Sequence, residues 1–161
     1  MSVLVVQGSA SDMEVMDKCC KTLKSLDISY TRRILSAHRT PNEADEIFAS
    51  AADKGFCVII AGAGLAAHLA GAAASRSMLP VIGVPLDGGP LQGMDALLST
   101  VQMPPGVPVG TVGIGRHGAV NAALLAGRIL ALSDEKVKRT LTEYGKKQRE
   151  KVLNADRELG E

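Results

Sequence analysis

The strongest constraint on the fold is a continuous apolar run, Phe56-Cys57-Val58-Ile59-Ile60-Ala61, which opens into Gly62-Ala63-Gly64. A strand that is apolar at successive positions is buried on both of its faces. Such burial is typical of parallel sheets that carry helices on either side. The run therefore predicts an α/β protein in which strands and helices alternate along the chain.

The remaining segments follow this alternation. Strands are predicted at 2–7, 29–35, 56–61, 81–84 and 109–114. One helix follows the turn at 8–12 and ends near Leu26, and others are predicted at 41–54, 66–76, 96–102, 119–132 and 134–156. Right-handed crossovers would join the strands into one parallel sheet. The predicted fold is a flavodoxin-like three-layer αβα sandwich of about five parallel strands, formed by a single domain over residues 1–161.

Four helix starts carry capping signals, and one helix end carries a glycine. The signals are, in chain order, Ser11 with Glu14, Thr40 with Glu43, Gly55 at the helix end, Asp95, and Asp134.

Composition narrows the function classes. The formal net charge is +1, which gives no electrostatic reason to expect nucleic acid or an anionic membrane as a partner. The chain starts almost at once with a strand and shows no signal peptide, and no apolar run suits a bilayer span. Cys19, Cys20 and Cys57 lack metal-ligand spacing and suggest a reducing compartment, so a cytoplasmic location is expected.

The turn Ser36-Ala37-His38-Arg39-Thr40-Pro41 is the first candidate for chemistry. It follows a predicted strand and precedes a predicted helix, and ligands bind at the carboxyl ends of parallel strands. The imidazole of His38 can move protons near neutral pH. The guanidinium of Arg39 offers a fixed fork of donors to a phosphate or carboxylate.

Glycine-containing turns follow three of the strands, at 8–12, 62–64 and 83–85. Glycine lets the backbone approach a ligand closely, and the following helix offers free N–H groups to an anion. The chain lacks both the dinucleotide fingerprint and the P-loop pattern. Asp12, at a helix start, either caps the helix or accepts ribose hydroxyls. Several such turns at one sheet edge predict a pocket.

Other chemistries find little support. His38, His68 and His117 are far apart in sequence, and no cysteine or carboxylate completes a familiar metal spacing, so no metal is expected. The nucleophile elbow of Ser-His-Asp hydrolases is absent. Acid–base chemistry on a small phosphorylated substrate remains, with His38 as the proton carrier.

The sequence resembles the PurE family of purine biosynthesis over nearly its whole length. The matching segments run in the family's order: Gly8-Ser9-Ala10-Ser11-Asp12, Ser36–Pro41, Ala61–Gly64 with Ala66–Leu69, Pro80–Pro85, and 101–104 through 121–123. The resemblance implies N5-carboxyaminoimidazole ribonucleotide mutase, which moves a carboxylate from the exocyclic nitrogen to ring carbon C4 without a cofactor. Arg39 and His68 favour this branch, because the carboxylase branch usually has lysine at the first position and lacks the second histidine.

The resemblance also implies roles for individual residues. His38 would be general acid and then general base, and the loop at 86–93 would be a lid. The substrate phosphate would bind Arg39, Ser9 and Ser11, and the ribose hydroxyls would bind Asp12. The expected site comprises His38 and His68 as catalytic residues and, as substrate-binding residues, Ser9, Ser11, Asp12, Ser36, Ala37, Arg39, Gly62, Ala63, Gly64 and Leu69.

Departures from the family pattern keep alternatives open. The departures are at Leu65, Ala70, the segment 87–90, Ala96 and His117. One alternative is aminoimidazole ribonucleotide carboxylase, acting on CO₂ directly. A second is a related carboxylase of nickel-pincer cofactor synthesis, disfavoured here by the short N-terminus. A third is a non-catalytic nucleotide-sensing module.

The last predicted helix carries many charges and few apolar residues. It is either a solvated terminal helix or an arm that packs on a neighbouring subunit. The Ala/Gly-rich helices at 65–76 and 118–131 favour an oligomer, because small residues allow close helix contact. The resemblance implies an octamer.

Overall fold

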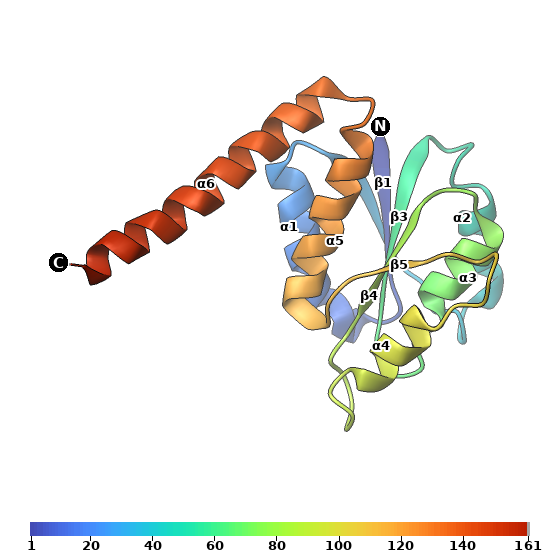
Figure 1. The fold of residues 1–161 in the computed structure, drawn as a ribbon. Coiled ribbons are helices and arrows are strands. Elements are labelled where there is room, and N and C mark those ends of the chain that lie inside the picture. Colours follow the sequence, from blue (N-terminus) through green and yellow to red (C-terminus); the bar gives the residue numbers. More distant parts are fainter. Residues whose placement is uncertain (161) are drawn as a thin grey trace.

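A computed structural model describes residues 1–160, so Glu161, the end of the predicted domain, lies outside the described residues. Within 1–160, five parallel strands form one sheet in the order β2-β1-β3-β4-β5 (Figure 1). The strands are β1 (Ser2–Gln7), β2 (Ser29–Ile34), β3 (Phe56–Ala63), β4 (Val81–Pro85) and β5 (Gly110–Thr111). This is the flavodoxin-like strand order, and it confirms the predicted fold class.

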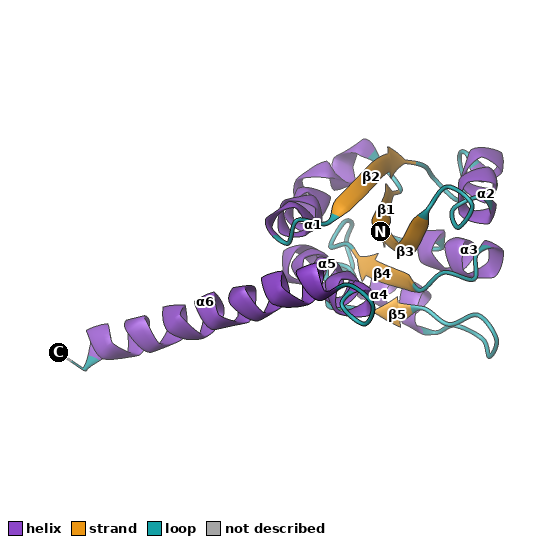
Figure 2. Cartoon of the chain, turned by 90° about the horizontal axis from the view of Figure 1, so that it is seen from above, coloured by secondary structure: helices purple, strands orange, loops and turns teal. Residues whose placement is uncertain are grey.

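Helices cover both faces of the sheet, as Figure 2 shows from above. The helices are α1 (Met13–Ser25), α2 (Pro41–Ala49), α3 (Leu69–Arg76), α4 (Met94–Val101), α5 (Gly115–Leu130) and α6 (Glu135–Leu159), with a short 3₁₀ helix at Ala10–Asp12. Helices α1 and α5 lie together on one face, and α2 and α3 lie on the other. The result is the three-layer sandwich expected from the alternation of strands and helices.

The core is divided into two halves by the sheet. Along β1, Val3 and Val5 pack toward α1 and α5, whereas Leu4 and Val6 pack toward α2 and α3. Alternate side chains of a strand point to opposite faces, so an apolar run fills both halves at once. Strand β2 lies at the sheet edge and is mostly exposed, which suits its two arginines.

Several element bounds differ from the predicted ones. Strand β5 has two residues in place of six, because the prolines and glycines around it interrupt regular pairing. Helix α2 ends at Ala49 with Ser50 as its C-cap, so the prediction of a helix to 54 that ends at Gly55 is wrong. Turns continue to Gly55, which has a positive φ of 81°. Helix α5 starts at Gly115, four residues early. Gly118 lies so close to the Gly113 carbonyl that any side chain there would collide with it.

The predicted caps are largely wrong. Ser9, not Ser11, caps the 3₁₀ helix by accepting from the Ser11 N–H at 3.3 Å, and Glu14 pairs with Arg116 instead. Thr40 stands at an N-cap, but its hydroxyl bonds to the backbone of Ser36.

Two further caps have opposite outcomes. Helix α4 starts at Met94 behind the positive-φ Gly93, so Asp95 is inside the helix and not its cap. Asp134 does cap α6, accepting from the N–H groups of Lys136 and Val137.

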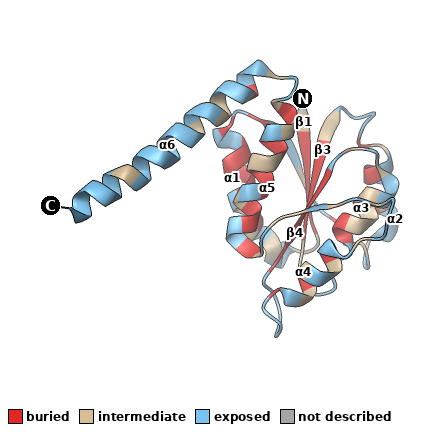
Figure 3. Ribbon diagram, in the orientation of Figure 1, coloured by how far each residue is buried: buried red, intermediate tan, exposed pale blue. Residues whose placement is uncertain are grey.

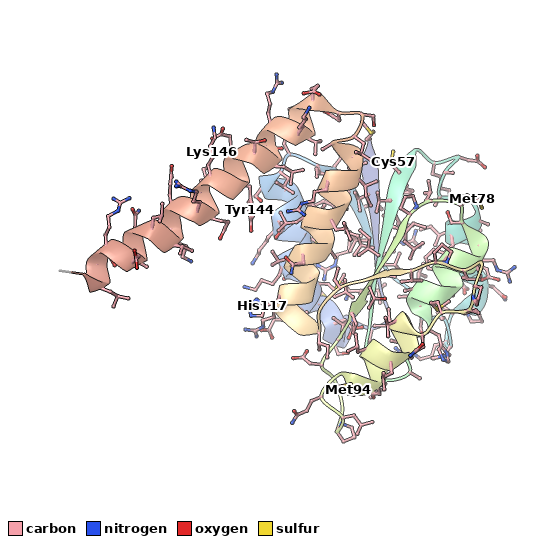
Figure 4. All side chains as sticks on the ribbon, viewed as in Figure 1. Cys57, Met78, Met94, His117, Tyr144 and Lys146 are labelled. Carbon is pink, nitrogen blue, oxygen red and sulfur yellow. The ribbon has the colours of Figure 1, made fainter. Side chains whose placement is uncertain are left out.

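Helix α6 leaves the body of the protein. Its first turns pack on the core through Val137, Leu141 and Tyr144, whereas the rest is mostly exposed (Figures 3 and 4). Within residues 1–160, no helix is both long and apolar enough to cross a bilayer.

Candidate active site

A cavity of about 600 Å³ opens at the carboxyl ends of β1 and β3. The sheet is wound in opposite directions on either side of these two strands, which makes this edge the switch point where α/β proteins bind ligands. The cavity is lined by Gly8, Ser9, Ser11, Asp12, Ser36, Ala37, His38, Arg39, Ala63, Gly64, Leu65, Ala66, His68, Leu69, Gly88 and Gly89.

Two imidazoles meet across this cavity. His38 Nε2 lies 2.7 Å from His68 Nδ1, and the ring planes are inclined by 76°. The first ring comes from the turn after β2 and the second from the residue before α3. One nitrogen must donate and the other accept for this contact to be a hydrogen bond, so the donor and acceptor roles of the two rings are linked.

The turn that carries His38 is held by its own side chains. The Ser36 hydroxyl accepts from the backbone N–H groups of His38 at 3.3 Å and Arg39 at 3.2 Å. Thr40 Oγ1 accepts from the Ser36 N–H at 2.8 Å. These local bonds replace regular helix capping and present both the imidazole and the guanidinium to the cavity.

Opposite this turn lies the loop that follows β1. Arg39 Nη2 donates to the Gly8 carbonyl at 3.0 Å, which ties the two loops together. The hydroxyls of Ser9 and Ser11 lie 2.9 Å apart on the same side. Two hydroxyls and a guanidinium form a set of donors suited to an anion.

Asp12 is the carboxylate of this loop. Partial burial raises its pKa above the usual value for an aspartate, and hydrogen bonds from Ser9 and Ser11 together with the charge of Arg39 offset part of that rise. A carboxylate kept this close to the anion donors suits neutral hydroxyl groups better than a second phosphate.

A buried amide supports the loop from below. Gln7 is fully buried and donates from Nε2 to the Ser9 carbonyl at 2.7 Å. Its Oε1 accepts from Arg32 Nε at 2.7 Å, and Arg32 also pairs with Asp17. The sequence analysis does not identify this support, because Gln7 of β1, Arg32 of β2 and Asp17 of α1 are separated by 10 to 25 positions and meet only in the folded chain.

All but one of the predicted site residues line the cavity. The exception is Gly62, which is buried within β3, where its carbonyl accepts from the Gly8 N–H at 3.1 Å. A Cβ on Gly62 would lie 2.5 Å from Met16 Sδ, so any side chain there would force the buried Met16 side chain to move. The predicted turn at 83–85 is wrong, because these residues belong to the buried strand β4 and do not line the cavity. Gly83 packs against the Thr100 side chain.

Five lining residues were not among the predicted site residues: Gly8, Leu65, Ala66, Gly88 and Gly89. Gly88 and Gly89 belong to the loop predicted as a lid, so that signal was present. His117 does not line the cavity and is exposed in the first turn of α5 (Figure 4). Among residues 1–160, no cluster of three or more metal-binding side chains occurs.

The fold and the site together define a flavodoxin-like α/β protein with two adjacent histidines beside a loop of hydroxyl and guanidinium donors. A family model described as AIR carboxylase matches residues 2–151. The chain belongs to this family, which is the PurE family that the sequence resembles.

Relatives and solved structures agree with this family. An N5-carboxyaminoimidazole ribonucleotide mutase of Brucella melitensis is 53% identical over 94% of both chains. The mutase of Bacillus subtilis is 48% identical over 96% of both. A crystal structure of PurE from Treponema denticola aligns with a TM-score of 0.87 and 28% identity over 99% of both chains.

Proposed function

We propose that this protein is an N5-carboxyaminoimidazole ribonucleotide mutase of purine biosynthesis. It is an isomerase that moves the carboxylate of its substrate from the exocyclic nitrogen to ring carbon C4. The high identity and coverage of relatives bearing that name support the assignment. Among the observations of the site, the one that carries it is the placement of His38 and Arg39 in one cavity with the Ser9–Asp12 loop.

The nucleotide is held by its phosphate and ribose. Arg39 and the hydroxyls of Ser9 and Ser11 bind the phosphate, and Asp12 accepts from the ribose hydroxyls. The Arg39–Gly8 bond supports this arrangement, because it keeps the guanidinium at the mouth of the same loop. The bound phosphate fixes the imidazole ring of the substrate relative to His38, as an oriented reaction requires.

His38 donates a proton to the exocyclic nitrogen and later accepts one from C4. The bond between the carboxylate carbon and the exocyclic nitrogen breaks, its electron pair stays on nitrogen, and protonated His38 supplies the proton. The CO₂ released then forms a bond to C4, and the C4 proton returns to His38. Neighbouring His68 shares a hydrogen bond with His38 and lies beside the backbone of 63–64, on the side where CO₂ would be held.

The carboxylase alternative uses the same cavity and differs only in its substrate. A direct assay separates the two: the purified protein is supplied with the N5-carboxylated nucleotide, or with the free amine and bicarbonate. Formation of the C4-carboxylate only from the second mixture would overturn the mutase assignment. The nickel-pincer alternative predicts turnover with neither.

The role of His38 is tested with His38→Asn. Loss of a general acid–base group is expected to lower kcat by about 10²- to 10⁴-fold while binding of the product nucleotide is kept. His117→Asn is the matched control, since that histidine is exposed and lies outside the cavity lining. If His38→Asn turns over as fast as His117→Asn, His38 is not the acid–base group.

We also propose a homo-octamer in the cytoplasm. The exposed outer part of α6 supports a helix that packs on a neighbouring subunit, and the three free cysteines among residues 1–160 suit a reducing compartment. Mass measurement of the full chain and of a chain ending at Glu143 tests the role of α6. If both chains form oligomers with the same number of subunits, α6 is a solvated terminal helix and not an arm that packs on a neighbouring subunit.

A further inference from the structure

Leu65 adopts a backbone conformation that leucine rarely takes. Its φ is 56°, in the left-handed region that favours glycine. The residue is also 55% exposed, although it lines the cavity. A large apolar side chain held in an unfavourable conformation and not buried in the core requires a reason.

Helix α4 holds this segment in place. Ser99 Oγ accepts from the Ala67 N–H at 3.0 Å and lies 3.5 Å from the Leu65 carbonyl. The same hydroxyl lies 2.7 Å from the Asp95 carbonyl one turn earlier in α4. The turn that carries Leu65 is thus anchored to a helix of the body of the protein.

The side chain reaches the loop on the other side of the cavity. A Cβ placed on Gly89 would lie 2.5 Å from Leu65 Cδ2, so the branched end of the leucine lies directly against that glycine. Gly89 has a φ of 82° and, like Gly88, lines the cavity. Leu65 therefore spans from the β3 turn to the loop at 86–93.

We propose that Leu65 is the apolar closure that retains CO₂ between the two halves of the reaction. This inference rests on the proposed function, because it concerns the intermediate of that reaction. CO₂ is small, has no net dipole and is lost by diffusion, so recapture at C4 depends on walls that exclude water and block escape. A leucine that joins the turn to the lid loop supplies such a wall, and a polar or shorter side chain would open it.

The experiment follows the fate of the carboxylate carbon. The unlabelled N5-carboxylated nucleotide is converted in the presence of ¹³C-bicarbonate and carbonic anhydrase, and label in the C4-carboxylate and release of the free amine are measured. The parent protein is expected to retain the original carbon. Leu65→Ala and Leu65→Asn are expected to raise both label and free amine severalfold, and Leu65→Met is expected to behave like the parent protein.

The variants separate the side chain from the backbone. Asparagine tolerates positive φ, so Leu65→Asn removes the apolar end at little conformational cost. Leu91→Ala is the matched control, because Leu91 is an exposed leucine of the loop at 86–93 that does not line the cavity. Melting temperatures report whether each variant is folded.

Failure of the inference and failure of the proposed function differ in outcome. If the parent protein does not convert the N5-carboxylated nucleotide, the proposed function fails. If it converts the nucleotide but its product is already fully labelled, or if Leu65→Asn retains carbon as well as the parent, Leu65 is not the closure. If Leu91→Ala releases as much of the original carbon as Leu65→Ala, the proposed role of Leu65 is likewise overturned.

Discussion

His38 Nε2 and His68 Nδ1 lie 2.7 Å apart, although thirty residues separate the two histidines in the chain. The contact lets one ring donate to the other, so the tautomer of each is set by its partner. In the proposed mechanism the imidazole of His38 must give and take a proton. His68 then orients that ring toward the substrate and stabilises the form needed at each step.

Removing His68 tests this coupling. His68→Ala is expected to lower kcat by about 10- to 100-fold with a smaller change in KM, because it removes an orienting hydrogen bond and not a substrate contact to the phosphate. His68→Asn is the conservative control, since its amide can occupy the position of Nδ1. Steady-state kinetics at one pH suffices, and equal losses in both variants would argue against an orienting role.

Arg39 is expected to act mainly on substrate binding. Arg39→Ala should raise KM about tenfold or more, the scale expected when a hydrogen bond to a charged group is lost. Arg39→Lys should recover only part of the affinity, because an ammonium lacks the planar fork. Arg33→Ala, an exposed arginine of β2, is the control for net charge. If Arg33→Ala weakens binding equally, the contact is not specific to Arg39.

Asp12 is expected to link stability to pH. Burial raises its pKa in the folded state above the unfolded value, so its contribution to stability is present at low pH and is lost as pH rises through the raised value. Asp12→Asn should therefore melt higher than the parent at pH 7. The difference should vanish below about pH 3.9, the ordinary aspartate pKa.

Activity should change in the opposite sense, because the amide is a weaker acceptor for ribose hydroxyls. KM for the nucleotide should rise in Asp12→Asn. A variant that melts lower than the parent at neutral pH would show that the carboxylate stabilises the loop instead.

A side chain at Gly62 is expected to destabilise the core, because the buried Met16 side chain must move to admit it. Gly62→Ala places a methyl group 2.5 Å from Met16 Sδ in the core, and overpacking of this kind costs about 1–3 kcal/mol of unfolding free energy. Gly145→Ala is the control, because Gly145 lies within α6 with no neighbour within 4 Å. That change should stabilise the protein by about 0.5–1 kcal/mol, because alanine has the higher helix propensity. Urea unfolding measures both.

Local patterns were sufficient to predict most of the fold. The apolar run at 56–61 indicated a central strand, and the alternation of strands and helices indicated the sandwich. Both depend on side-chain periodicity, which the backbone geometry converts directly into buried faces. Capping was predicted less well, because the hydroxyl of Thr40 and the carboxylate of Glu14 found other partners, Ser36 and Arg116, that only folding brings near.

The sequence by itself determined the fold class, the glycine-containing turn at 8–12 and the histidine–arginine turn, since each depends on patterns within short segments. Only the tertiary structure decided which turns meet. Crossover connections place 8–12, 36–40 and 63–69 at one sheet edge, while residues 83–85, predicted as a turn, are buried in β4. The contact of His38 with His68, the support of Ser9 by Gln7 and the reach of Leu65 to Gly89 join distant segments, and such contacts depend on packing across the whole sheet.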